Sequence, residues 1–340
     1  MERIVNLTKE KRKILFESAA RELKVSSTII EKDFWVCYVL NYLMNVSKFK
    51  DYFIFKGGTS LSKCYNVIKR FSEDVDLILK WDKIGFDDEE VYKNRSKNQD
   101  YKFEVLMNEK GAYFIQNEFK KDLIENFANK IEDVEIVSDA NDPMVLFVKY
   151  PTGYKDEYIL SSVKLEIGPV AAKTPVEIEH IEPYCFKSFH ADNKYPFNVV
   201  TVTIARTFWE KLLILHAECN RPQDKRTPMR YSRHYYDVFM MHKSSFFRSI
   251  LIDKFLFEEV KAFKSKYYRT AWSNLDDCSL ENIRLVPSNE KIKELSQDYS
   301  KMKDMIFDNA PSFEEIIFNI GLLEEELHEI NNDKIHYIEN

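Results

Sequence analysis

The chain has 340 residues, with 50 Lys and Arg against 56 Asp and Glu, which gives a formal net charge of −6. Its hydrophobic fraction of 44%, with 25 Phe and 19 Tyr, excludes intrinsic disorder as the main state. Its length predicts two domains, or one core with large elaborations. The mild acidity excludes a protein that coats nucleic acid by bulk charge, so any such contact needs a local basic patch.

Cysteine spacing and hydropathy indicate the compartment. The five cysteines are far apart and show no CxxC spacing, so they indicate reduced thiols rather than a disulfide framework or a zinc site. No apolar run reaches the ~18 residues of a membrane span, and the first residues do not resemble a signal peptide. We therefore expect a soluble cytoplasmic protein without membrane contact.

The N-terminal half alternates between helical and strand patterns. Residues 8–44 predict two helices, the second starting at the capping-box pair Thr28 and Glu31. Residues 52–55 predict a short buried strand that stops at Gly57-Gly58, and apolar residues at helical spacing follow over 61–68. Residues 75–79 alternate as a strand does, whereas the charged stretch 82–110 predicts a surface loop.

Further along, the pattern changes from mixed to helical. A helix is expected over 114–131, and strands are expected over 145–150, 158–167 and 176–181. From Thr203 onward the apolar spacing predicts helices only, the last announced by Ser312 and Glu315 and ending near residue 330. We therefore predict an α+β fold, with a mixed sheet and flanking helices in a domain over 1–200 and a helical C-terminal domain over 201–340.

Asp74-Val75-Asp76 is the pattern that points to chemistry. Residues i and i+2 of a strand point to the same face, so the two carboxylates lie side by side. Like charges at that separation are costly unless a cation lies between them, and carboxylate oxygens with substrate phosphates suit Mg²⁺. Taken alone, the pattern favours two acids at a solvated strand end.

Gly57-Gly58 lies one predicted helix upstream of this pair. Two glycines between a strand and a helix allow close approach of a ligand, and the first helical amides can bind an anion. A tight turn capped by Thr59 or Ser60 is the alternative. Together, the diglycine turn and the acidic strand describe a nucleoside triphosphate site, with one element for phosphates and the other for metal.

Several motifs resemble the AbiEii/AbiGii toxin family of nucleotidyltransferases, in the DNA polymerase β-like superfamily. They are Lys56-Gly57-Gly58-Thr59-Ser60, Arg70-Phe71-Ser72 with Asp74-Val75-Asp76, Phe208-Trp209-Glu210-Lys211, and Arg233-His234-Tyr235-Tyr236-Asp237. Glu31-Lys32-Asp33-Phe34-Trp35 is also similar to the family, so the resemblance extends from about residue 28 to residue 240. The interval between Thr59 and Asp74 is longer than in compact superfamily members, and His234 stands where Asp is common.

The resemblance implies a polymerase β-like domain and assigns roles to residues. It implies Asp74, Asp76 and a third strand acid, Glu166, as ligands for Mg²⁺ or Mn²⁺, and Lys211 and Asp237 as further catalytic residues. Glu166 is equally compatible with an exposed acid paired with Lys164, and Asp237 is also compatible with an ordinary helix ion pair to Arg233 one turn earlier. The nucleotide-binding residues expected are Lys56, Gly57, Gly58, Thr59, Ser60, Arg70, Ser72 and Lys211, although Arg70 and Ser72 are also compatible with a structural turn.

The acceptor is indicated by a basic loop in this acidic chain. Its cations, which we expect to contact RNA, are Arg221, Lys225, Arg226, Arg230 and Arg233. A solvated loop between helices is the alternative. The resemblance implies an NTP substrate, tRNA as acceptor, and a cognate antitoxin protein as partner. Other interpretations are a DxD glycosyltransferase, which predicts a Rossmann-like parallel sheet, and a nucleotide- and RNA- or partner-binding protein without turnover.

Overall fold

A computed structural model describes residues 1–72, 74–154, 160–188, 196–307 and 309–330 of the chain. Contacts divide the chain into two units. Unit 1 comprises Met1–Asn66 and Phe71–Val202, and unit 2 comprises Val67–Arg70 and the chain from Thr203 onward. The chain therefore leaves unit 1 for four residues before it returns to form the Asp74-Val75-Asp76 strand.

Unit 1 is built on a seven-stranded mixed sheet with the order β3-β4-β5-β2-β1-β7-β6. The pairs β2·β5 and β1·β7 are parallel, and the other four pairs are antiparallel. The strands are β1 (Phe53–Lys56), β2 (Asp74–Leu79), β3 (Glu135–Ser138), β4 (Val145–Lys149), β5 (Ser162–Gly168), β6 (Val176–Ile181) and β7 (Phe197–Val202).

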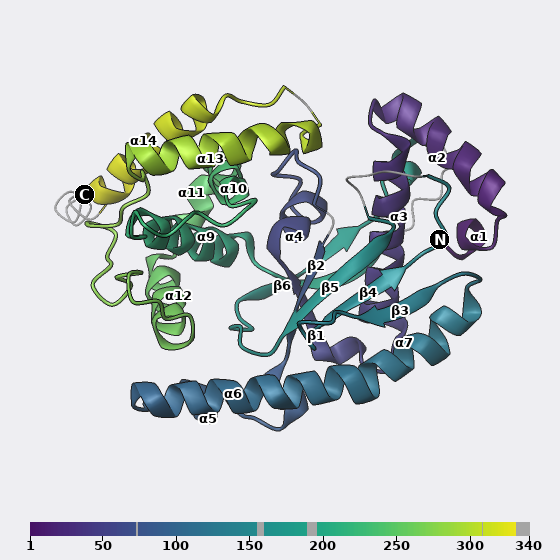
Figure 1. Cartoon of the computed structure of the whole chain (residues 1–340), viewed down its shortest axis with the longest axis horizontal. Coiled ribbons are helices and arrows are strands. Elements are labelled where there is room, and N and C mark those ends of the chain that lie inside the picture. The colour runs from purple at the N-terminus through teal and green to yellow at the C-terminus, as the bar shows by residue number, and fades with distance from the viewer. Residues whose placement is uncertain (73, 155–159, 189–195, 308, 331–340) are drawn as a thin grey trace, which may run out of the picture. The chain divides into compact units, whose positions relative to one another are not determined.

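Helices surround this sheet in unit 1. They are α1 (Glu2–Val5), α2 (Lys9–Leu23), α3 (Ser27–Asn41), α4 (Gly57–Lys63), α5 (Asp88–Tyr92), α6 (Lys97–Phe114), α7 (Lys120–Asn126) and α8 (Cys185–Ser188). The buried helix α3 packs against β5 and β7, and α4 contacts β1 and β2 (Figure 1). A π-helical turn continues each of α3 and α6, over Tyr42–Val46 and Ile115–Phe119.

The two faces of the sheet bury different residues. Val75, Leu77 and Leu79 of β2 enter the main core, which also contains most of α3. On the opposite face Ile78 packs with Ile54 in a much smaller apolar cluster. Because side chains alternate along a strand, Asp74 and Asp76 share the face of Ile78 and not the main core.

Unit 2 is helical. Its helices are α9 (Ile204–Cys219), α10 (Ser232–His242), α11 (Phe247–Ile250), α12 (Lys254–Tyr267), α13 (Asn289–Met302) and α14 (Phe313–Glu329). Aromatic side chains form much of its interior, as in the edge-to-face pair of Trp209 with Phe257, whose ring centroids are 5.4 Å apart. Within the unit, α9 packs against α10, α11 and α12, and α10 packs against α13 and α14.

The predicted α+β class is confirmed, with a mixed sheet and flanking helices followed by a helical C-terminal part. The strands β2, β4 and β6 and the helices α9 and α14 lie where the sequence predicts them. Residues 158 and 159 of the predicted strand 158–167 lie outside the described residues, and β5 begins at Ser162. The strands β3 and β7 and the helix α13 were not predicted.

Three local predictions were wrong. The stretch 82–110 is not a loop, because α5 and most of α6 lie in it. The second N-terminal helix is capped by Ser26, whose side chain accepts from the amide of Ile29, and not by Thr28. Glu31 instead accepts hydrogen bonds from Thr152 Oγ1 and the amide of Gly153, which removes it from any capping box.

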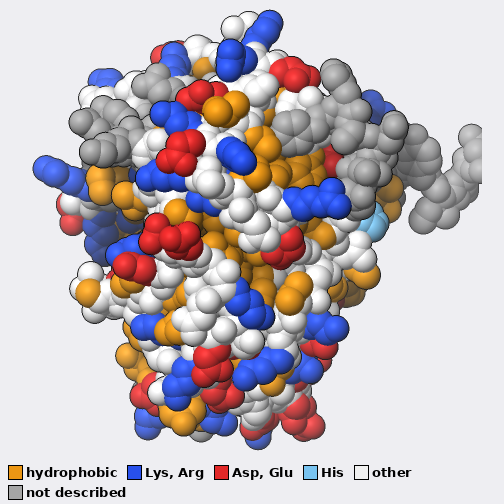
Figure 2. Space-filling view, turned by 90° about the vertical axis from the view of Figure 1, so that its right-hand side faces the viewer, with side chains coloured by type: hydrophobic (Ala, Val, Ile, Leu, Met, Phe, Trp, Pro, Cys, Tyr) orange, Lys and Arg blue, Asp and Glu red, His pale blue; other side chains and the backbone are white. Residues whose placement is uncertain are grey.

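The surface shows charges of both signs. The face in Figure 2 carries Lys, Arg, Asp and Glu side chains interspersed around exposed hydrophobic ones, in keeping with a net charge close to balance. Among the described residues, no helix combines the length and apolar character that crossing a membrane requires.

Candidate active site

The acidic pair of β2 lies in a row of charged residues that crosses three strands. Lys56 of β1 is the register partner of Asp76, and Asp76 is the register partner of Glu166 on β5. One step earlier along β2, Asp74 is the partner of Lys164. Directly paired residues of neighbouring strands present their side chains on one face, so these five charges share the face opposite the main core.

Lys164 contacts another charged residue of the same row, Glu166. Its Nζ forms a hydrogen-bonded ion pair with Glu166 Oε1. Partial burial works against its charge, but the contact with Glu166 and the negative charges of Asp74 and Asp76 outweigh that effect and raise the pKa of Lys164. Glu166 is therefore paired with Lys164 and is also the register partner of Asp76, and its role as a metal ligand stays a prediction.

Gly57 brings the diglycine turn against Asp76. Its φ of +82° is a conformation that side chains disfavour, and a Cβ at this position would lie 2.0 Å from Asp76 Oδ2. Helix α4 begins at Gly57, with Lys56 at the N-cap and no side-chain cap. The glycines therefore form the first turn of the helix, two residues earlier than expected, and neither Thr59 nor Ser60 is its cap.

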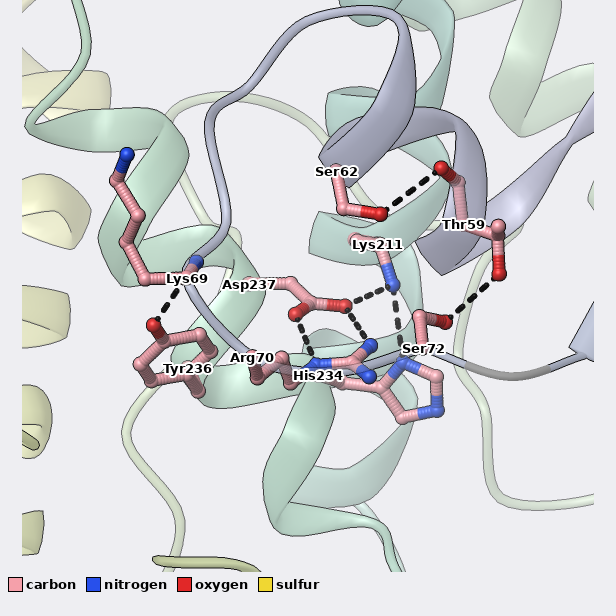
Figure 3. Close-up of polar contacts among 9 residues, drawn as sticks. All are labelled: Thr59, Ser62, Lys69, Arg70, Ser72, Lys211, His234, Tyr236 and Asp237. Atoms are coloured by element: carbon pink, nitrogen blue, oxygen red, sulfur yellow. Dashed lines mark hydrogen bonds and ion pairs between the residues drawn. The ribbon is translucent and has the colours of Figure 1, made fainter. Parts of the chain in front are cut away.

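Thr59 and Ser72 tie this helix to the start of β2. The buried Thr59 hydroxyl is hydrogen bonded to the Ser72 hydroxyl at 2.9 Å (Figure 3), and it donates to the carbonyl oxygen of Asp74 at 2.5 Å. Ser60 Oγ donates to the carbonyl of Gly57 at 2.9 Å. These contacts fix the backbone of the diglycine turn and of the acidic strand relative to each other.

A second cluster of predicted residues lies in unit 2, around the buried carboxylate of Asp237. Arg70 reaches it with Nε 2.8 Å from Oδ1 and a second guanidinium nitrogen 2.9 Å from Oδ2, and Lys211 Nζ is 2.8 Å from Oδ2 (Figure 3). Lys211 Nζ also lies 3.4 Å from Nδ1 of His234. Asp237 is thus held by two cations, of which Arg70 binds it in a bidentate manner.

Charge and burial set the protonation of this cluster. Burial alone would raise the pKa of Asp237, but Arg70 and Lys211 outweigh it and hold that pKa well below the usual value. Burial lowers the pKa of Lys211, against the attraction of Asp237. Burial and the neighbouring charge of Lys211 lower the pKa of His234 well below its usual value, so this imidazole is neutral near pH 7.

The geometry makes Arg70 a tether in the structure. Arg70 is 5% exposed, and its guanidinium is bound to Asp237. The backbone of the preceding residue, Lys69, is hydrogen bonded through both its amide and its carbonyl. Its amide donates to the Tyr236 hydroxyl, and its carbonyl accepts from Phe307. The predicted contacts of Arg70 and Lys211 with phosphates stay predictions.

The predicted RNA-contacting residues lie in the loop between α9 and α10 or just inside α10. Lys225, Arg226 and Arg230 are exposed, and Arg221 and Arg233 are half-buried. Arg221 Nε forms an ion pair of 2.6 Å with the buried Glu218. The sequence pattern gave no indication of this carboxylate, which is one turn before Arg221 and lies inside helix α9.

One buried ion pair between α3 and α4 was also not predicted. Lys63, at the end of α4, has its Nζ 2.6 Å from Asp33 Oδ1 of α3, and both side chains are almost fully buried. Burial lowers the pKa of Lys63, but the negative charge of Asp33 outweighs this effect, so the pKa is raised overall. The signal was present in the family-like Glu31-Lys32-Asp33 motif, but its partner could not be identified from the sequence.

The residues of unit 1 suit a hard divalent cation. Asp74, Asp76 and Glu166 supply carboxylate oxygens on one face, which is the ligand type that Mg²⁺ prefers. In the described part of the chain, no three His, Cys, Asp or Glu side chains are already arranged around one metal position. Asp74 and Asp76 have the ligand type that suits Mg²⁺, Glu166 lies beside Asp76 in register while one of its oxygens contacts Lys164, and the binding of a metal by the three stays a prediction.

Two solved structures resemble the fold. The crystal structure of JHP933 from Helicobacter pylori has a TM-score of 0.45 and 17% sequence identity, covering 92% of this chain and 96% of that one. MenT4, a nucleotidyltransferase toxin from Mycobacterium tuberculosis H37Rv, has a TM-score of 0.43 and 16% identity, covering 91% and 98%. No curated protein sequence matches the chain.

A protein-family model gives the clearer result. The model described as nucleotidyl transferase AbiEii toxin, type IV toxin–antitoxin system, matches residues 39–319. This span contains the diglycine turn, the acidic strand, the Lys211 helix and the Asp237 helix. The chain therefore belongs to the AbiEii family of nucleotidyl transferase toxins of type IV toxin–antitoxin systems.

Proposed function

We propose that this nucleotidyltransferase toxin moves a nucleoside monophosphate from an NTP to a hydroxyl group of RNA, with tRNA as the acceptor. The supporting observation is the row of Lys56, Asp76 and Glu166 across three strands, with the first turn of α4 against Asp76. A carboxylate pair next to a helix start has the parts that phosphoryl-type transfer needs, which are positioning and neutralisation of charge.

In this proposal Asp74, Asp76 and Glu166 hold Mg²⁺ or Mn²⁺. When bound, the metal would neutralise triphosphate charge and lower the pKa of the attacking hydroxyl. Lys164 balances part of the carboxylate charge through Glu166. Thr59 and Ser72 keep the start of β2 against α4, so that the carboxylates and the helix start face a ligand together.

The phosphates are assigned to the first turn of α4. The first amides of a helix have no carbonyl partner within that helix, and here they belong to the turn around Gly57 and Gly58. Gly57 lets the backbone come close to Asp76, so a phosphate on these amides would lie near the metal ligands. Lys56, at the end of β1, adds a positive charge in the same row.

Labelling of RNA tests the proposal. Incubation with Mg²⁺, labelled NTPs and total tRNA should transfer label to RNA, and removal of the metal with EDTA should abolish the transfer. Asp76→Asn should reduce the rate by at least about a hundredfold, because a charge that binds the metal is lost. Glu135→Gln, an exposed acid on β3 that pairs with Lys149, is the matched control and should retain full activity.

Two outcomes would contradict the proposal. Folded protein that labels no RNA with any of the four NTPs would exclude transfer to RNA. Growth inhibition that survives Asp74→Ala but disappears with substitutions in the basic loop would favour a binding protein without turnover. The glycosyltransferase interpretation is disfavoured by the sheet itself, because it predicts a Rossmann-like parallel sheet and four of the six strand pairs are antiparallel.

A further inference from the structure

Trp272 stands out among the four tryptophans of the chain. Trp35, Trp81 and Trp209 are 0% exposed, whereas Trp272, in the segment between α12 and α13, is only half-buried. Its indole N–H donates to no group in the part of the chain that the structure describes.

Two cations of the basic loop lie against this indole ring. Lys225 Nζ is 4.0 Å from the ring centroid of Trp272, and Arg221 Cζ is 5.3 Å from it. Arg221 Cζ also lies 5.8 Å from the ring of Tyr231. The loop therefore joins positive charge and aromatic surface at one place, which is the combination that proteins use to bind single-stranded nucleic acid.

The backbone of the loop is held in place by helix α13. Asp298 accepts from the amides of Arg230 and Ser232, at 2.6 and 3.0 Å. Glu294 accepts from the amide of Thr227 at 3.1 Å, and Lys291 Nζ donates to the carbonyl oxygen of Lys225 at 2.5 Å. These carboxylates therefore fix the loop through its backbone amides.

The side chains differ in how firmly they are held. Arg221 is anchored by the buried carboxylate of Glu218, so its guanidinium keeps its position beside the two rings. Within the described residues, neither Lys225 nor Arg226 forms an ion pair with a carboxylate. A loop whose backbone is already held in place loses less conformational entropy when it binds a ligand.

We propose that Trp272 is a stacking platform for an unpaired base of the RNA acceptor, with Lys225 and Arg226 contacting the adjacent phosphates. This inference rests on the proposed function, since it specifies where the RNA of that reaction is held. Every base has a π-face, so the platform accepts single-stranded RNA of any sequence, and the sugar-phosphate backbone supplies the charge that the two cations bind. A paired helix would not present a base to the ring.

Tryptophan fluorescence provides the test, because the other three indoles are buried. Wild-type protein titrated with total tRNA, or with a single-stranded RNA oligonucleotide, should lose tryptophan emission and gain protection from acrylamide. Trp272→Phe should still bind RNA but show neither change. Trp272→Ala should weaken the binding of end-labelled RNA, measured by anisotropy, by about tenfold, as expected for the loss of one stacked base.

Charge variants separate the cations from the ring. Lys225→Met should weaken binding and reduce the slope of log affinity against log salt by about one, since one phosphate contact is lost. Arg248→Ala, an exposed arginine of α11, is the matched control and should change neither quantity. Circular dichroism of each variant checks that it is folded.

The outcomes distinguish this inference from the proposed function. RNA binding without any change in Trp272 emission, or with Trp272→Ala binding as tightly as wild type, would overturn the platform alone. Absence of RNA binding by the wild type would overturn both the platform and the RNA acceptor. Transfer of label from an NTP to another acceptor would then show that the nucleotide site acts without either.

Discussion

At the scale of single residues, Gly57 carries the strongest constraint. Both its positive φ and its distance from Asp76 Oδ2 exclude a side chain. We expect Gly57→Ala to push the Asp76 carboxylate out of place and to reduce nucleotide transfer by about a hundredfold, as misplacements near 1 Å do. The measurement is label transfer to RNA at saturating NTP.

The control for this variant is another glycine of the same sheet. Gly168, at the end of β5, has nothing within 4 Å of a built Cβ, so Gly168→Ala should keep its activity. Wild-type activity in Gly57→Ala would contradict the role given to the diglycine turn. An equal loss in both would point to the sheet as a whole.

Asp237 governs stability and its dependence on pH. Asp237→Asn leaves the buried Arg70 and Lys211 without a full negative charge, which costs about 3–5 kcal/mol of unfolding free energy. Urea denaturation measures this. Glu315→Gln breaks the half-exposed pair with Lys243 and should cost at most about 1 kcal/mol.

The sign of the pH effect follows from the depressed pKa of Asp237. Its contribution is present above the unfolded value of about 3.9 and is lost as pH falls towards the folded-state pKa. Wild type should therefore lose stability more steeply than Asp237→Asn between about pH 5 and pH 2. Parallel curves for the two proteins would show that Asp237 is not ionised in the folded state.

The same cluster shows what single residues reveal in advance. Asp74 and Asp76 could be read from the sequence because both lie on one strand and their spacing fixes their common face. The partner of Asp237 could not, since Arg70 is 167 residues away and the ordinary helix neighbour, Arg233, was the expected alternative. Burial made the distant pair decisive, and burial is not visible in local spacing.

At the scale of secondary structure elements, the C-terminal end of α4 is held by an ion pair between Lys63 and Asp33 of α3. Lys63 Nζ is bound by Asp33 Oδ1 and by the carbonyl oxygen of Glu182, while Asp33 Oδ2 accepts from the amide of Tyr184. We expect Asp33→Asn or Lys63→Met to cost about 3 kcal/mol or more, because each leaves a buried charge without its counterpart.

A double-mutant cycle measured by thermal unfolding tests the coupling. The double variant Asp33→Asn with Lys63→Met should cost clearly less than the sum of the two single changes. Lys13→Ala, which removes an exposed i,i+4 pair with Glu17 on α2, should change stability by at most about 0.5 kcal/mol. Additive single effects would mean that the pair does not hold α4.

Elements were predicted well where one face is buried and poorly where burial is slight. The strand β2 alternates cleanly because one of its faces enters the main core. Helix α6 buries only a few residues, among them Met107 and Phe114, so most of it was predicted as part of a charged loop. The start of α4 was placed too late because glycine is a poor helix former and its positive φ was not foreseeable.

At the scale of the whole molecule, the two units are interleaved in sequence. Val67–Arg70 belongs to unit 2, although the chain on both sides of it belongs to unit 1. We expect a fragment starting at Thr203 to be less stable than unit 2 in the full chain, because it lacks Arg70 and leaves Asp237 with Lys211 alone. Urea denaturation followed by circular dichroism measures this.

The control is the same fragment with a neutral residue at position 237. Asp237→Asn should cost the fragment less than it costs the full chain, since the bidentate partner is already missing. A fragment that unfolds at the same urea concentration as unit 2 of the full chain would contradict the interleaving. The predicted domain bounds, 1–200 and 201–340, stay predictions.

The order in which the chain is synthesised determines when Arg70 can bind Asp237. At roughly 5–20 residues per second, the ribosome delivers Asp237 about 8–33 s after Arg70, because 167 residues separate them. Throughout that interval Arg70 lacks the Asp237 carboxylate that its guanidinium binds in the folded chain. The contact between Arg70 and Asp237 therefore forms only after α10 has been synthesised, and a translation product that stops short of α10 lacks this contact.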